Sequence, residues 1–240
     1  GPPAGRRGRG IAVKGRRVLV AASVAVAVAS AALGIWNSSW LKLETVQVTG
    51  NHHATTQQVQ AAAALSPGVR LTAVSSARVS ARVSDLPWVA DATVTHVLPS
   101  RIRISIRERT PAVVVQAGSR TYLVDHSGAV LQEGGAGYPV IAALPLTVSF
   151  PGDRLALPAF GAAVALLDAF PADLKPRLAW VNAPSPDLLS VILTDKTAIT
   201  YGTADSLPAK NYDLTTLLAT GKPYASIDVR SPTHPAASLR

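Results

Sequence analysis

Three stretches of the sequence combine residue types that could carry out chemistry, and the first is Asp125-His126-Ser127. It holds the three side-chain types of a hydrolase triad. Consecutive residues alternate between faces or fan out around a turn, so these side chains cannot form the hydrogen-bond relay of nucleophile, base and orienting acid. Asp125 and the following Gly128 are typical of turns. The stretch therefore predicts a hairpin turn and not a catalytic site.

The other two stretches could hold a metal ion or a phosphate group. His52-His53 follow a Gly-Asn turn signal, and neither pairs with another ligand at a spacing such as H-x-x-x-H. Gly134-Gly135-Ala136-Gly137 shares only its glycine content with a phosphate-binding loop, since no Lys-Ser or Lys-Thr follows it. The 14 acidic residues are scattered singly, so only the fold could bring a pair of glycosidase carboxylates together. We therefore expect no metal, no cofactor and no catalytic residue.

The positive charge of the chain is concentrated at its start. The net charge of +9 comes from 23 basic and 14 acidic residues, and six of the basic ones lie in residues 1–17, which hold no acidic residue. Because the remainder is nearly balanced, the charge does not predict nucleic-acid binding. The chain has no cysteine, which excludes disulfides, thiolate nucleophiles and thiolate metal sites.

Residues 18–36 predict a transmembrane helix. No charged residue occurs between Arg17 and Lys42, and eighteen consecutive residues from Val18 are almost entirely apolar. Such a helix reaches about 27 Å, close to the hydrocarbon thickness of a bilayer. Four residues are expected to anchor it at the two membrane surfaces: Arg16, Arg17, Trp36 and Trp40. By the positive-inside rule, the basic residues that precede the helix place residues 1–17 in the cytoplasm and the chain after the helix outside.

A cleavable signal peptide is the alternative interpretation of the same segment. It would also begin with basic residues, and Ala29-Ser30-Ala31 is a passable cleavage site. The apolar core of a signal peptide is usually about 7–15 residues long, which is shorter than this one. We therefore favour a membrane helix that is retained.

The first exterior segment predicts a small domain over residues 41–110. A strand at 45–49 precedes an Ala-rich helix at 59–65, which Thr55 and Gln58 cap with capping-box spacing. A second helix follows, and then a hairpin of two strands around Pro99-Ser100. The order strand, helix, helix, strand, strand predicts a small sheet with both helices on one face.

The second strand of that hairpin alternates isoleucine with arginine. Its arginines, Arg101, Arg103 and Arg107, form a row that could contact anionic wall polymer or lipid headgroups. A solvated outer face of the strand explains the same pattern, and it is the interpretation that we favour.

Residues 111–231 predict a second, strand-rich domain. Strand patterns recur from 112–115 to a last strand at 225–229, with helices expected at 157–170 and 207–218. Pro232 and Pro235 argue that ordered structure ends within a few residues of Arg230, which leaves 232–240 as a tail. The fold class is therefore α+β.

Several of these segments together resemble the FtsQ/DivIB family of bacterial cell-division proteins. The resemblance covers nearly the whole chain and is carried by five motifs in a fixed order: Val46-Gln47-Val48-Thr49-Gly50-Asn51, Leu86-Pro87-Trp88-Val89, Leu98-Pro99-Ser100 running on to Arg107-Glu108-Arg109-Thr110-Pro111, Leu123-Val124-Asp125, and Ile227-Asp228-Val229-Arg230. It implies a bitopic protein with a cytoplasmic tail, a membrane helix, a POTRA domain of order β-α-α-β-β and a mixed β domain.

The resemblance also implies a function and a binding site. Members of the family are non-enzymatic scaffolds of the divisome that gather FtsL-type and FtsB/DivIC-type partners and help to control the septal peptidoglycan synthase complex. The partner would add a strand at the end of the β domain, and the arginine of a D-x-R motif would contribute a charge pair. The implied partner-binding residues are Tyr224, Ile227, Asp228, Val229 and Arg230. The nearby prolines could instead displace the interface onto the helix at 207–218.

The expected location is the cell membrane at the division septum, as a single-pass type II protein in contact with membrane lipid. Two other functions remain open. A membrane-anchored cell-wall hydrolase or transferase would need a catalytic cluster that the sequence does not nominate. A POTRA-type secretion chaperone would bind many unfolded clients and not a few fixed partners.

Overall fold

The computed structural model describes residues 22–30, 34, 41–146, 150–232 and 234–240. Residues 22–30 and 34 are helical. Within the described ranges, no helix is both long and apolar enough to cross a membrane. About half of the predicted span 18–36 lies outside the described residues, and so do the four predicted anchoring residues Arg16, Arg17, Trp36 and Trp40.

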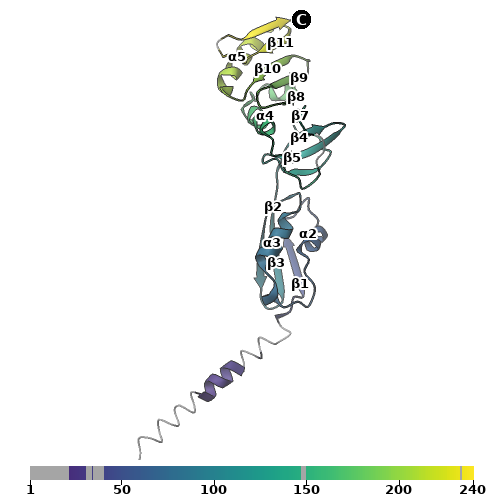
Figure 1. Ribbon diagram of the computed structural model, residues 1–240, viewed down its shortest axis with the longest axis vertical. Helices are drawn as coiled ribbons and strands as arrows, with labels where there is room; N and C mark the ends of the chain where they lie inside the picture. The colour runs from purple at the N-terminus through teal and green to yellow at the C-terminus, as the bar shows by residue number, and fades with distance from the viewer. Residues whose placement is uncertain (1–21, 31–33, 35–40, 147–149, 233) are drawn as a thin grey trace, which may run out of the picture.

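From residue 41 onwards the chain forms two sheets that follow one another along the long axis of the molecule (Figure 1). The N-terminal domain holds a three-stranded sheet and the C-terminal domain a nine-stranded sheet. This agrees with the predicted α+β class.

The N-terminal domain has the predicted order of strand, helix, helix, strand, strand. Its sheet has the order β1-β3-β2, in which β1 runs parallel to β3 and β2 runs antiparallel to it. The elements are β1 (Thr45–Thr49), α2 (Thr56–Ala63), the short 3₁₀ helix η2 (Leu71–Ala73), α3 (Ser76–Ser84), β2 (Val89–Val97) and β3 (Arg101–Glu108).

The predicted capping box begins α2. The backbone N–H of Gln58 donates to Thr55 Oγ1 (3.2 Å), and the N–H of Thr55 donates to Gln58 Oε1 (2.8 Å). These two bonds satisfy backbone groups that a helix start leaves unpaired.

The two helices cover one face of the three-stranded sheet. Val59 of α2 and Val79 of α3 are buried against Ile102 and Ile104 of β3. Full burial of such a side chain stabilises the fold by about 1.5–3 kcal/mol. The alternating arginines of β3 are exposed, as the pattern predicts.

The C-terminal domain is built around a mixed sheet of order β12-β11-β10-β9-β8-β7-β4-β5-β6. Its pairs β4/β7, β7/β8 and β10/β11 are parallel and the others are antiparallel. The elements are β4 (Pro111–Ala117), β5 (Arg120–Asp125), β6 (Val130–Glu133), β7 (Val140–Ala142), α4 (Pro158–Ala169), η3 (Lys175–Arg177), β8 (Leu178–Asn182), β9 (Leu189–Leu193), β10 (Ala198–Gly202), α5 (Leu207–Ala219), β11 (Tyr224–Asp228) and β12 (Ala236–Leu239).

Helices α4 and α5 bury their apolar sides in the core of the larger sheet. Leu166 of α4 and Leu214 of α5 belong to one buried cluster with Val191 and Ile199. The side-chain amide of Asn211 on α5 donates to the carbonyl of Ala169 at the end of α4 (2.7 Å), which joins the two helices.

The chain remains ordered beyond the two prolines, so the expectation that structure ends near Arg230 is wrong. Residues Ala236–Leu239 form β12, which pairs antiparallel with β11. Pro232 and Pro235 lie in the connection between the two strands. Proline removes a donor within a strand but is tolerated in the link between strands. The last strand of the sheet is therefore β12, and β11 is an interior strand.

Arg109 and Trp88 connect the two domains. The backbone N–H of Arg109 donates to the Trp88 carbonyl (2.8 Å), and Arg109 Nη1 contacts Asp125 Oδ2 (2.9 Å). The Trp88 side chain packs against the core of the N-terminal domain and against a small cluster of the C-terminal domain, formed by Val114, Leu123 and Leu131.

Candidate functional site

The predicted hairpin turn at Asp125 forms and leaves no hydrolase triad. Asp125 Oδ1 accepts hydrogen bonds from the backbone N–H groups of Ser127 (2.9 Å) and Ala129 (2.8 Å) and from the Ser127 hydroxyl (2.7 Å). Burial raises the pKa of Asp125, but these bonds and the Arg109 charge outweigh it and hold the pKa below its ordinary value. His126 faces Asp168, 3.9 Å from Nδ1 to the carboxylate, and not Ser127. The carboxylate therefore orders the turn.

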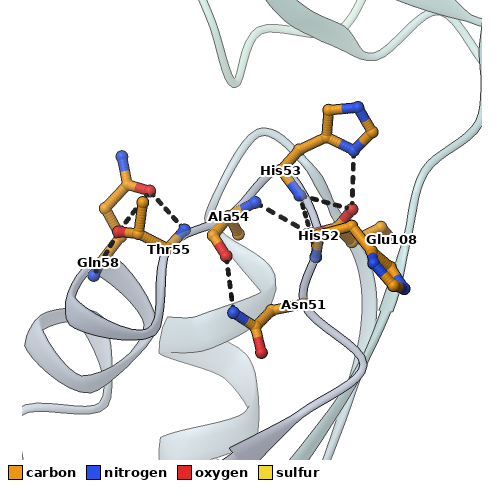
Figure 2. Close-up of polar contacts among 7 residues, drawn as sticks. All are labelled: Asn51, His52, His53, Ala54, Thr55, Gln58 and Glu108. Atoms are coloured by element: carbon orange, nitrogen blue, oxygen red, sulfur yellow. Dashed lines mark hydrogen bonds and ion pairs between the residues drawn. The ribbon is translucent and has the colours of Figure 1, made fainter.

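The histidine pair lies in a turn that a single carboxylate organises (Figure 2). The backbone N–H groups of His52, His53 and Ala54 all donate to Glu108 at 2.8–3.0 Å, and His53 Nδ1 lies 2.9 Å from the same carboxylate. Burial raises the pKa of Glu108, but the hydrogen bonds outweigh it and lower the pKa to about 2. The His53 ring also stacks on Trp88 with centroids 4.0 Å apart. Glu108 thus ties this turn to the end of β3, beside the junction.

The strongest candidate for a binding site is the open edge of the larger sheet at β12. Antiparallel backbone pairing holds β12 to β11, and the Ser226 and Ser238 hydroxyls, 2.8 Å apart, add a side-chain hydrogen bond. Just beyond the strand, the backbone N–H of Arg240 donates to the Pro223 carbonyl (2.9 Å). The Arg240 side chain adds bonds to Asp195 and Thr197. These contacts anchor a short strand whose own residues bury little surface.

The outer side of β12 carries unused backbone groups. Within the part of the chain that the structure describes, β12 is the last strand of the sheet, and all four of its residues are exposed. Backbone groups of an antiparallel strand alternate in direction. Since the N–H of Arg240 points to β11, those of Ser238 and Ala236 do too, and those of Ala237 and Leu239 point outward.

Three of the predicted partner-binding residues are core residues. The side chains of Tyr224, Ile227 and Val229 are buried in the cluster beneath α4 and α5. They can fix the position of β11 and so of β12, but their side chains do not reach the surface.

The other two predicted residues form an ion pair beside the open edge. Arg230 Nη2 lies 2.6 Å from Asp228 Oδ2, and Arg230 Nε also donates to this carboxylate. The Arg230 side-chain hydrogen bond holds the pKa of Asp228 below its ordinary value. The Arg230 side chain is 62% exposed, so its guanidinium is both oriented and accessible.

Gly202 and Lys210 support the region around the Asp228–Arg230 ion pair. The sequence alone predicts neither role. Gly202 has φ +69°, and a Cβ there would lie 3.1 Å from Arg230 Cγ, so the arginine stem crosses the glycine backbone. The Lys210 side chain on α5 is only 1% exposed and donates to the carbonyls of Tyr201 and Thr203 and to Asp205. It pins the loop that follows Gly202. Nothing in the local sequence marks a lysine on an amphipathic helix as buried.

Comparison with known proteins agrees with this architecture. The family model for the FtsQ-type POTRA domain matches residues 41–109, and the model for the C-terminal domain of cell division protein FtsQ/DivIB matches residues 112–230. Cell division protein FtsQ of Streptomyces collinus is 31% identical over 232 residues, which is 92% of this chain and 87% of that protein. The chain belongs to the FtsQ/DivIB family.

Two other relatives support the same assignment. FtsQ of Mycolicibacterium smegmatis is 32% identical over 226 residues, 93% of this chain and 65% of that protein. FtsQ of Streptomyces venezuelae is 28% identical over 243 residues, 98% of this chain and 88% of that protein. The N-terminal domain is thus a POTRA domain, the C-terminal one is the family's β domain, and the protein belongs to the machinery of bacterial cell division.

Proposed function

We propose that the protein is a membrane-anchored, non-enzymatic scaffold of the divisome that binds an FtsB/DivIC-type partner along the outer edge of β12. The open edge is the observation that carries the proposal. A strand with outward-facing N–H and C=O groups can pair with a partner strand, which supplies affinity from the backbone and specificity from side chains beside it.

Arg230 supplies such a side chain. It follows β11 next to the edge, and the Asp228 carboxylate holds its guanidinium in one orientation. An acidic residue that follows the partner strand would meet a fixed, exposed cation. Charge-assisted contacts of this kind fix the register of a pairing more than they raise its affinity.

The proposed topology keeps the predicted segments. Residues 1–17 form a cytoplasmic tail, 18–36 span the membrane, and 41–110 form the POTRA domain. The β domain begins at 111, and since β12 belongs to its sheet, it extends beyond 231 to Leu239. The FtsL-type partner and the septal peptidoglycan synthase complex would be gathered through the bound FtsB/DivIC-type protein.

Removal of β12 alone tests the site. Truncation after Ser231 deletes the edge strand but keeps β11, α5 and both cores. We expect the shortened protein to insert into the membrane and to lose co-purification with the FtsB/DivIC-type partner. Undiminished co-purification would show that the partner binds elsewhere on the protein.

A fluorescent fusion tests the cellular role separately. We expect the full-length fusion to gather at the division site of growing cells. An even distribution around the envelope of dividing cells would contradict the proposed place in the divisome.

A further inference from the structure

The tip of the β2–β3 hairpin is fixed beside the point where the described chain enters the POTRA domain. The backbone N–H of Glu44 donates to the Ser100 carbonyl (2.8 Å), and the Ser100 hydroxyl donates to Glu44 Oε2 (3.0 Å). The next residue, Thr45, pairs with Arg101 at the start of β3. The hairpin tip therefore lies at the end of the domain that begins the fold, away from the β domain (Figure 1).

Basic side chains gather at this end. Lys42 and Arg70 face each other in an isolated antiparallel bridge, and Arg101 stands at the foot of β3; all three are exposed. Glu44 is the single acidic residue in the three segments that meet here, 41–49, 66–71 and 96–103. At the opposite end of β3, Arg107 instead lies opposite Asp91 in the register of the β2–β3 ladder. The excess of positive charge thus belongs to one end of the arginine row.

A large apolar side chain lies at the same end of the domain. Leu98, at the tip of the hairpin, is 71% exposed. Single exposed leucines are common on protein surfaces, so exposure alone carries no conclusion. An exposed apolar group at the same end of a domain as several cations is a combination by which peripheral proteins enter the interface of an anionic bilayer.

The distance to the predicted membrane span favours a bilayer as the occupant. Five residues lie between Trp36 and Lys42, and an extended chain over that stretch reaches at most about 20 Å. A surface tethered so closely experiences a high effective concentration of the bilayer, so weak contacts suffice.

We propose that this end of the POTRA domain docks on the membrane, with Leu98 in the headgroup region of the bilayer and Lys42, Arg70 and Arg101 against anionic lipid headgroups. The inference rests on the proposed membrane span at 18–36. Docking holds the POTRA domain in one orientation on the bilayer. The Trp88 and Arg109 contacts at the junction carry that orientation to the β domain.

Fluorescence quenching in lipid nanodiscs tests the docking, because the chain has no cysteine of its own. The full-length protein carries an environment-sensitive label either at Leu98→Cys or, as control, at Ser119→Cys in the exposed turn between β4 and β5. The discs contain spin-labelled lipid in an anionic or a zwitterionic background. We expect the label at 98 to be quenched about twofold or more above the label at 119 in anionic discs, and less in zwitterionic discs.

A charge-reversal variant tests whether the basic residues, and not the label itself, bring position 98 to the bilayer. Lys42→Glu combined with Arg101→Glu is expected to reduce quenching at 98 to the level at 119, with an unchanged far-UV spectrum. Equal quenching at 98 and 119 in anionic discs, from protein that co-elutes with the discs, would overturn the docking and leave the membrane span intact. Protein that fails to co-elute with the discs would overturn the span itself.

Discussion

The two edge strands of the nine-stranded sheet, β6 and β12, differ in whether another segment covers them. At the β6 end, the segment 150–155 covers the start of the edge strand: Val130 donates to the Asp153 carbonyl (2.9 Å), Gly152 donates to the Val130 carbonyl (2.9 Å), and Leu155 donates to that of Gly128 (2.7 Å). Val130 and Leu131 of β6 are buried. At the other end, β12 pairs with β11 on one side, and within the described residues no strand covers its other side.

This difference supports the proposal that the open edge binds a partner. An uncovered edge strand invites unwanted pairing, and proteins usually close it with charge, proline, a bulge or a covering segment. The fold closes the β6 edge at the cost of a long connection. The β12 edge instead presents two alanines and a serine, which offer little steric hindrance, followed by the exposed Leu239, and it has the oriented Arg230 beside it. The β12 edge therefore has the features of a docking strand.

The largest expected effect comes from blocking the open edge. Ala237→Pro removes an outward-facing N–H, keeps the bonds to β11 and places a ring where the partner backbone would lie. An unsatisfied partner carbonyl costs about 1–3 kcal/mol, and the lost bond adds to it, so affinity for the FtsB/DivIC-type partner should fall about a hundredfold. Ala237→Thr keeps the N–H and should bind like the wild type in the same titration calorimetry. Equal affinity of the proline and threonine variants would remove the backbone of β12 from the interface.

A change in the POTRA domain tests whether the edge acts independently of it. The Glu108 pKa is lowered from 4.5 to about 2, so its carboxylate stabilises the fold above pH about 4.5, and this contribution is lost as the pH falls towards 2. Its size is about 2–3 kcal/mol. We expect Glu108→Gln to lower the free energy of unfolding by that amount at pH 7, and to differ less from the wild type at pH 3. Denaturant titrations at the two pH values measure this, and partner affinity at pH 7 should not change.

Opening the closed edge is expected to have a smaller effect on stability. Gly128 has φ +85°, and a Cβ there would lie 2.7 Å from the Leu155 carbonyl oxygen. Gly128→Ala should therefore push away the covering segment and cost about 1–3 kcal/mol of unfolding free energy. Gly118 in the β4–β5 turn also has a positive φ, of +61°, but a Cβ there would have no neighbour within 4 Å. Gly118→Ala is therefore the control, because it adds backbone strain without a steric clash. Faster hydrogen exchange in β6 should accompany the Gly128 change alone.

The smallest expected effect concerns the charge beside the open edge. Arg230→Ala should weaken partner binding about threefold to tenfold and leave the stability of the fold almost unchanged, since its ion pair is exposed. The loss should shrink at high salt. Lys222→Ala, an exposed cation in the turn before β11, is the control. If both variants lost the same amount of partner affinity, Arg230 would act only through the overall surface charge and not through a specific contact.

The sequence predicts the POTRA domain well because its signals are local. The Thr55 and Gln58 capping box and the isoleucine alternation of β3 are complete within short windows, and both appear in the structure. The β12 strand escaped prediction because its four residues, two alanines, a serine and a leucine behind two prolines, show little alternation. Its order comes from distant partners, such as Ser226 and the Asp195 and Thr197 contacts of Arg240.

The proposed site at β12 lies one strand beyond the predicted partner-binding residues, for the same reason. The motif that carries the family resemblance includes Ile227 and Arg230, and the structure shows that the first is a core residue and the second an exposed cation. Only the fold reveals that Gly202 leaves room for the arginine stem and that Lys210 is buried beneath the adjoining loop. Burial of a charged side chain depends on tertiary contacts, so its local sequence gives no sign of it.

Residue-resolved hydrogen exchange with and without the FtsB/DivIC-type partner tests the central claim most directly. In the free protein, the outward amides of Ala237 and Leu239 should exchange quickly, whereas those of β6 should be protected. In the complex, we predict strong protection of Ala237 and Leu239 and no change in β6. A fully formed complex in which these two amides still exchange as fast as in the free protein would contradict strand addition at β12.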